Sequence, residues 1–233
     1  MVLGKSVNIV YYTANVADES FCESIRRHIC AVAPGIPIVS VSQKPINFGK
    51  NICVGDIGQS HLNIYRQMLI GAKAAVSDYV IICEDDTLYA PGHFTSFLPP
   101  PDTFAYNINR WRIYSWTHPP VFSYSERPVG SQLIAPRKLL VDCLTERFEK
   151  FKNESDIPHL KYFCEPGRRE RQLGVSPQKM MSFKSRGAPN IVFTTEQSLG
   201  FNHLKTKKAH GRIKKTQLPY WGSAQEVLKY YKK

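Results

Sequence analysis

Alternating blocks of apolar and polar residues divide the first third of the chain into strands and helices. Patterns typical of buried strands, rich in β-branched and aromatic residues, occupy Val7–Asn15, Ile36–Ser42 and Asp78–Cys83. Apolar residues recur at helical spacing in Asp18–Ala33 and Ser60–Val76. The order strand, helix, strand, loop, helix, strand predicts an α/β fold with a largely parallel sheet.

The rest of the chain has a weaker pattern. The segment Gln43–Gly58 is rich in Gly, Pro and Asn, which predicts a loop. Strand-like aromatic pieces fill Phe104–Ala135 and end in a stretch that resembles a hairpin with Gly130 near its turn. An amphipathic helix is expected over Arg137–Asn153, and Pro158–Lys215 is loop-rich and basic.

Polar side chains follow each of the three predicted parallel strands, in Thr13–Asn15, Ser42–Lys44 and Glu84–Asp86. Ligands of open parallel sheets bind outside the carboxyl ends of the strands, so these segments are expected to cluster in space. No G-x-G-x-x-G follows the first strand, and no GxxxxGK[ST] occurs in the sequence. A usual NAD site and an ATP-hydrolysing P-loop are therefore excluded.

Three consecutive acids, Glu84, Asp85 and Asp86, follow the apolar strand directly. Their mutual repulsion is costly unless a cation lies among them. Hard divalent cations such as Mg²⁺ and Mn²⁺ prefer carboxylate oxygens, and substrate phosphates often complete their coordination shell. The pattern predicts a metal–diphosphate site. The alternative is that the acids only solvate a loop or cap a helix.

Bulk properties place the chain among single-domain proteins without a membrane span. Its 233 residues suit one large domain. No run of about 18 apolar residues exists, and the N-terminus lacks the apolar core of a signal peptide, so we expect a cytoplasmic protein. The six cysteines form no CxxC pair and have no zinc spacing, which favours reduced thiols.

The net charge of +12 is concentrated late in the chain. Residues 161–215 contain 13 basic side chains against three acids. A basic face attracts polyanions through its long-range field and through counterion release. The excess over what nucleotide phosphates need favours a larger anion, such as nucleic acid or an anionic lipid surface. A solvated face that aids solubility is the alternative.

The stretch "YVIICEDDTLYAPGHF", Tyr79–Phe94, resembles the acidic signature of GT-A fold glycosyltransferases, the Asp-x-Asp site that holds a metal and a sugar nucleotide. Glu84–Asp86 fits it as Glu-x-Asp. Upstream, Asn63–Ala75 resembles the helix that precedes this signature in family-2-like enzymes, and "LPYWGSAQEVL" is similar to the tail of small bacterial and phage glycosyltransferases. The resemblance covers residues 7–94 and later patches.

The resemblance implies a GT-A (Rossmann-like) fold: a mostly parallel central sheet flanked by helices, with an irregular basic C-terminal part. The whole chain, 1–233, would be one domain. Residues 1–94 would bind the nucleotide sugar, and residues 95–233 would bind the acceptor. The implied activity is that of a hexosyl- or pentosyltransferase with Mn²⁺ or Mg²⁺ as cofactor and a nucleoside-diphosphate sugar, expected to be UDP-linked, as donor.

Individual residues acquire expected roles from the resemblance. Ser42 and Gln43 stand where such enzymes often place a base-reading Asp, which this chain lacks. The remaining nucleotide-sugar contacts would be Thr13 and Asn15 to the base or ribose, Arg66 to the base or diphosphate, Glu84 to the ribose or sugar, and Asp85 to the sugar hydroxyls. Asp86 would bind the metal, with His203 as a further ligand and His210 as second candidate.

Breaking the anomeric C–O bond leaves a nucleoside diphosphate and an oxocarbenium-like centre. A bound metal ion stabilises the departing diphosphate as a Lewis acid. An inverting enzyme also needs a carboxylate base near the acceptor hydroxyl, for which Glu165 and Glu126 are the candidates. Glu165 could equally form an ion pair within the surrounding arginines. A retaining enzyme could lack such a base, so the stereochemistry stays open.

The late basic segment predicts the acceptor. It could line a phosphate-tracking groove, and phages that carry 5-hydroxymethylpyrimidines use small enzymes of this kind. We therefore expect sugar transfer to a hydroxymethylated pyrimidine in DNA, in the host cytoplasm if the chain is phage-encoded. The alternatives are a glycosyltransferase for lipid-linked or surface saccharides and a non-enzymatic nucleic-acid-binding module. The predicted acceptor-binding residues are Arg168, Arg169, Arg171, Lys205, Lys207, Lys208, Arg212, Lys214 and Lys215.

Overall fold

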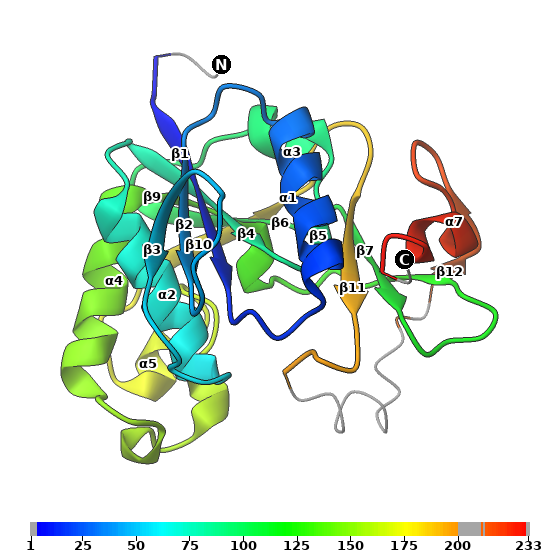
Figure 1. Ribbon diagram of the computed structural model, residues 1–233. Helices are drawn as coiled ribbons and strands as arrows, with labels where there is room; N and C mark the ends of the chain where they lie inside the picture. The colour runs from blue at the N-terminus through cyan, green and yellow to red at the C-terminus, as the bar shows by residue number, and fades with distance from the viewer. Residues whose placement is uncertain (1–3, 200–210, 212, 232–233) are drawn as a thin grey trace.

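The computed structural model describes residues 4–199, 211 and 213–231. Its centre is a seven-stranded sheet with the order β10-β6-β9-β4-β1-β2-β3 (Figure 1). Within it, β9 runs antiparallel to both of its neighbours, and the other strand pairs are parallel. The expected α/β class with a mostly parallel sheet is confirmed.

The central sheet contains β1 (Val7–Thr13), β2 (Ile38–Ser42), β3 (Lys50–Cys53), β4 (Tyr79–Glu84), β6 (Thr103–Asn107), β9 (Leu133–Pro136) and β10 (Lys179–Phe183). A five-stranded second sheet has the order β12-β8-β7-β11-β5, made of β5 (Thr87–Leu88), β7 (Arg110–Tyr114), β8 (Phe122–Tyr124), β11 (Asn190–Thr194) and β12 (Ile213–Lys215). β13 (Gln217–Leu218) pairs with β14 (Gly222–Ser223). The helices are α1 (Glu19–Val32), α2 (His61–Ala74), α3 (Pro91–Thr95), α4 (Arg137–Lys150), α5 (Glu170–Leu173) and α7 (Ala224–Leu228), with 3₁₀ turns η1 (Gly130–Gln132), η2 (Glu154–Asp156) and η3 (Leu160–Tyr162).

The central sheet is covered on both faces. Along β1, Val10 and Tyr12 pack in a cluster with α2 and α4, whereas Ile9 and Tyr11 pack in a second cluster with α1 and the second sheet. Because alternate side chains of a strand point to opposite faces, a strand buried on both faces is apolar throughout. This explains the unbroken apolar runs in the sequence. Among the described residues, no helix is long and apolar enough to cross a membrane.

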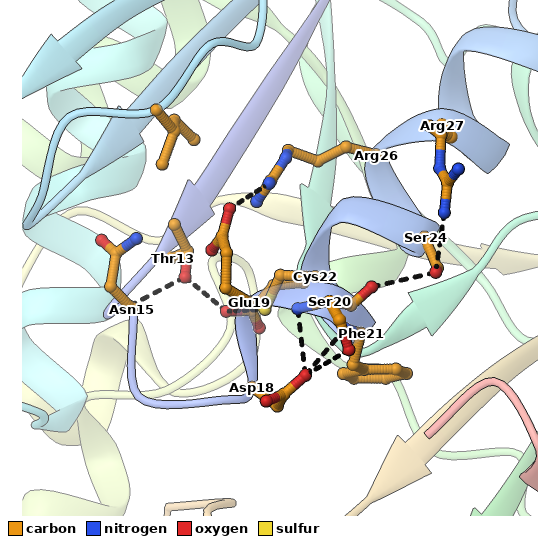
Figure 2. A network of polar contacts seen from close by, with 12 residues as sticks. Thr13, Asn15, Asp18, Glu19, Ser20, Phe21, Cys22, Ser24, Arg26 and Arg27 are labelled. Carbon is orange, nitrogen blue, oxygen red and sulfur yellow. Dashed lines mark hydrogen bonds and ion pairs between the residues drawn. The ribbon is translucent and has the colours of Figure 1, made fainter. Parts of the chain in front are cut away.

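The two N-terminal helices begin at side-chain caps. The Asp18 carboxylate accepts hydrogen bonds from the backbone N–H groups of Ser20 (2.9 Å) and Phe21 (3.2 Å), and Figure 2 shows Asp18 at the first turn of α1. The Ser60 hydroxyl accepts from the backbone N–H of Asn63 (3.2 Å) at the start of α2. Such caps satisfy backbone donors that a helix start leaves free. The helix starts inferred from sequence therefore agree closely with the structure.

Two local expectations are wrong. The segment expected to be a loop, Gln43–Gly58, contains β3, a half-exposed edge strand that pairs parallel with β2. The expected hairpin around Gly130 does not form, since β8 pairs with β7 and β12 in the second sheet, whereas β9 pairs with β4 and β6 in the central one. Local sequence pattern predicts strands better than it predicts which strands pair.

Close contact between α2 and the sheet depends on Gly71. A Cβ atom at this position would lie 2.4 Å from Val10 Cγ1 and 3.3 Å from Val41 Cγ2. Both neighbours are β-branched side chains in the buried cluster, so neither can move aside freely.

We expect Gly71→Ala to lower the free energy of unfolding by about 1–3 kcal/mol, because overpacking of a dense core outweighs the higher helix propensity of alanine. Denaturant unfolding measures the change. Lys73→Ala is the matched control, since Lys73 is exposed on the same helix. A stability of Gly71→Ala equal to or above that of the unchanged protein would contradict this packing.

Candidate functional site

A cleft of about 340 Å³ opens at the carboxyl ends of β1 and β4. Its wall is built from the ends of these strands, the starts of α1 and α2, the segment before η1 and the end of β11. This is the edge at which parallel α/β sheets bind ligands. The polar side chains of the wall include Thr13, Glu84, Asp85, Asp86, Arg112, Arg127 and Glu165.

Hydrogen bonds join the three polar strand ends to one another. The Asn15 side-chain oxygen accepts from the backbone N–H groups of Gln43 (2.9 Å) and Lys44 (3.0 Å). The Thr13 hydroxyl accepts from the backbone N–H of Asn15 (2.9 Å) and donates to the Asp85 carboxylate. Figure 2 shows Thr13 beside Asn15. The predicted clustering of these segments is confirmed.

Each of the three acids accepts a hydrogen bond from one hydroxyl group. The Tyr12 hydroxyl donates to Glu84 and the Thr13 hydroxyl donates to Asp85. The Thr87 hydroxyl donates to Asp86 (2.9 Å). All three bonds favour the ionised carboxylates.

Burial and mutual repulsion oppose ionisation of the same acids. Burial raises the pKa of Glu84 to about 8, and the Asp86, Asp85 and Glu165 carboxylates add to this rise against the bond from Tyr12. Burial and Asp85 raise the pKa of Asp86 to about 7, whereas the bond from Thr87 and the Arg112 guanidinium lower it. Burial also raises the pKa of Asp85. The acids therefore form a site that is short of positive charge.

The residues present fit a divalent cation for which the protein would supply only some of the ligands. The donor set is carboxylate oxygen, which Mg²⁺ and Mn²⁺ prefer. In the described ranges, however, no group of three or more His, Cys, Asp or Glu side chains is arranged to hold a metal ion. Glu84 and Asp86 would thus supply one or two ligands, and a substrate diphosphate would supply others. The predicted further ligand His203, and its alternative His210, lie outside the described residues.

Glu165 lines the cleft, and a buried ion pair braces its loop. Arg168 donates to the Glu165 carboxylate at 2.7 Å. The fully buried Arg147 donates to the Cys164 carbonyl (2.6 Å) and to Glu170 (2.7 Å). The second base candidate, Glu126, is exposed, accepts from the Tyr124 hydroxyl and pairs with Lys184 (2.9 Å), and it does not line the cleft.

Three of the expected nucleotide contacts have side chains that serve local structure. Ser42 accepts from the Asn51 amide (2.9 Å). The Gln43 side chain bonds to the backbone of the loop before α2. Arg66 donates to Asn63 (3.0 Å) and to the Lys152 carbonyl (3.4 Å). None of these three lines the cleft, and neither does the predicted contact Asn15, whose side-chain oxygen accepts from the backbone of Gln43 and Lys44.

The predicted acceptor-binding residues are only partly described. The Arg169 guanidinium lies 5.7 Å from the centre of the Tyr162 ring, and Arg171 is exposed. Lys214 and Lys215, exposed on β12, line a shallow depression of the surface. Lys205, Lys207, Lys208 and Arg212 lie outside the described residues.

The sequence analysis did not predict two residues of the cleft, Arg112 and Arg127. Arg110 and Arg112 alternate around Trp111, so they occupy one face of a strand, which is a signal that could have been read. Arg127 gave no such signal, because its position in the cleft depends on tertiary structure.

No family model matches the chain, and no curated protein matches it. Among solved structures, the chain is similar to a glycosyltransferase involved in the glycosylation of the major capsid of PBCV-1, with 9% identity, a TM-score of 0.46, and coverage of 80% of this chain and 93% of that one. It is also similar to S. aureus TarS 1–349, with 10% identity, a TM-score of 0.42, and coverage of 81% of this chain and 60% of that one. A third similar structure is the bifunctional IspDF from Campylobacter jejuni, with 10% identity, a TM-score of 0.38, and coverage of 78% of this chain and 50% of that one.

We expect the affinity of the chain for Mn²⁺ to rise at least about tenfold between pH 6 and pH 8.5. Metal binding needs ionised carboxylates, and the raised pKa values of about 7 and 8 keep Asp86 and Glu84 protonated at the lower pH. Calorimetric titration of Mn²⁺ into the ligand-free chain measures this. An affinity that is the same at both pH values would contradict the assignment.

Proposed function

We propose that the chain is a metal-dependent glycosyltransferase that moves a sugar from a nucleoside-diphosphate sugar, with UDP as the expected nucleotide, to an acceptor hydroxyl. The observation that carries the proposal is the cleft itself. Half-buried carboxylates from the end of β4 meet there with guanidinium groups, at the strand edge where α/β folds bind nucleotides. A cleft that contains both carboxylates and guanidinium groups suits a ligand that combines a cation with phosphates.

In this proposal, Asp86 and Glu84 hold the divalent cation from the protein side. When bound, the cation supplies Lewis-acid stabilisation of the departing diphosphate. Asp85 stays fixed by its bond from Thr13, so it can orient sugar hydroxyls. At the end of β1, Thr13 lines the cleft and is offered to the nucleotide.

Glu165 is the proposed base for an inverting reaction. Its carboxylate lines the cleft, and the bond from Arg168 fixes its orientation. A general base must lie within hydrogen-bond reach of the acceptor hydroxyl, and Glu165 is better placed than the exposed Glu126 for this task. If the enzyme retains configuration, Glu165 serves to position the acceptor.

The proposed acceptor is a 5-hydroxymethylpyrimidine base in DNA. Support comes from the net charge of +12 and from the exposed lysines of β12 beside a shallow depression of the surface. Contacts of this kind bind the phosphate backbone without reading sequence. The alternative acceptors are lipid-linked and surface saccharides, which carry the same hydroxyl chemistry.

A thermal-shift panel of nucleotide sugars with Mn²⁺ tests the donor side. We expect one UDP-sugar, at about 100 times its dissociation constant, to raise the melting temperature by about 5–10 °C, because it binds only the folded state. Asp86→Asn should abolish the shift. Asp142→Asn, an exposed carboxylate on α4, should keep it. Absence of any shift across the panel, combined with salt-sensitive DNA binding, would favour the non-enzymatic nucleic-acid-binding module instead.

The acceptor side uses the sugar nucleotide that the panel identifies. Radiolabelled sugar should transfer to duplex DNA that contains hydroxymethylated pyrimidines and not to unmodified duplex. Glu165→Gln should lower the transfer rate by at least about 100-fold without loss of the thermal shift, and Glu149→Gln, an exposed residue on α4, is the control. Transfer to saccharides alone would overturn the DNA acceptor.

A further inference from the structure

Three arginines gather beside the acids of the cleft. Arg110 and Arg112 lie on one face of β7, and Arg127 belongs to the segment between β8 and η1. Arg112 and Arg127 line the cleft. Arg110 is fully buried, and its Nε and Nη2 donate to the Arg127 carbonyl at 3.3 and 2.8 Å. The buried guanidinium thereby fixes the backbone that carries Arg127.

The charge of Arg112 lowers the pKa of the nearby Asp86, but none of the three arginines takes part in an ion pair within the described part of the chain. Arg112 Nε and Arg110 Nη1 are buried and have no hydrogen-bond partner among the described residues. Burial and the charges of Arg112 and Arg127 lower the pKa of Arg110 to about 9.

Buried donors without partners are uncommon, since native structures satisfy nearly all of them. Two buried guanidinium N–H groups, on Arg110 and Arg112, are left without partners among the described residues beside the exposed Arg127, which indicates a missing anion. The neighbouring carboxylates do not supply it, because their hydrogen bonds come from hydroxyl groups and, among the described residues, no ion pair joins them to these arginines. The missing partner is therefore expected to come with a ligand.

We propose that Arg112 and Arg127 form a phosphate-binding subsite in the cleft. The planar guanidinium fork matches phosphate oxygens in pairs, and two such groups suit a ligand with several oxygens. The subsite deepens the proposed function and rests on it for the identity of the ligand. Two substrates can bring the phosphate: the donor through its diphosphate, and a nucleic-acid acceptor through its backbone.

Inorganic phosphate tests the subsite without any donor or metal. Its dissociation constant is measured by NMR titration for the unchanged protein and for Arg112→Gln, Arg127→Gln and Arg186→Gln. Arg186 is exposed, and its side chain has no hydrogen bond or ion pair among the described residues, so it is the matched control. Each cleft variant should bind phosphate about tenfold more weakly, and the control should bind it unchanged. Equal binding by all four proteins would overturn the proposal.

Two further titrations of the same proteins identify the source of the phosphate. Weaker binding of UDP with Mn²⁺ by the cleft variants assigns the subsite to the donor. Weaker binding of a short DNA duplex with UDP binding unchanged assigns it to the acceptor. If the cleft variants bind both UDP and the DNA duplex as tightly as the unchanged protein, the subsite is not a substrate site and the proposal is overturned. The titration with inorganic phosphate does not depend on sugar transfer. It therefore tests the subsite even if the proposed glycosyltransferase activity is not found.

Discussion

Repulsion among three carboxylates at the end of β4 is the constraint on which the rest of the site depends. The fold places Glu84, Asp85 and Asp86 where burial disfavours their charges. It gives each only one hydroxyl donor, from Tyr12, Thr13 or Thr87. Those bonds reduce the cost of ionisation without removing it. An added cation would remove it, which is why the cleft is interpreted as a metal–diphosphate site.

The surrounding structure keeps the acids in place through contacts distant in sequence. The Asp86 carbonyl accepts from the backbone N–H of Phe193 (2.7 Å), which ties the end of the acidic segment to β11. Asn15 joins the ends of β1 and β2. The fully buried pair of Arg147 and Glu170 braces the loop that carries Glu165. Removing one partner of such a pair leaves a buried charge uncompensated, so this loop is rigidly specified.

Much of the N-terminal half could be predicted from the sequence, because its strands are apolar on both faces and its helices have clear caps. The acidic segment was also identifiable, since three carboxylates after an apolar strand are unusual. The edge strand β3 was missed because Lys50–Cys53 is short and half-exposed. The partners of β8 were missed because local sequence does not encode which of the two sheets a strand joins, and β8 pairs with β7 and β12 in the second sheet.

Individual site residues were harder to predict than the position of the site. Arg66 occupies a helix that borders the cleft, yet its guanidinium turns to Asn63 and the Lys152 carbonyl. Arg127 lines the cleft from a segment whose backbone carbonyl accepts from the buried Arg110. Both outcomes depend on side-chain direction and on tertiary contacts, which spacing along the sequence does not encode.

The most direct test of the central claim is anomalous diffraction from Mn²⁺ in crystals of the chain grown with UDP. We predict a manganese peak in coordination contact with the Asp86 carboxylate, with diphosphate oxygens of UDP completing its shell. UDP bound in the cleft with no manganese beside Glu84 or Asp86, or manganese bound only elsewhere, would contradict it.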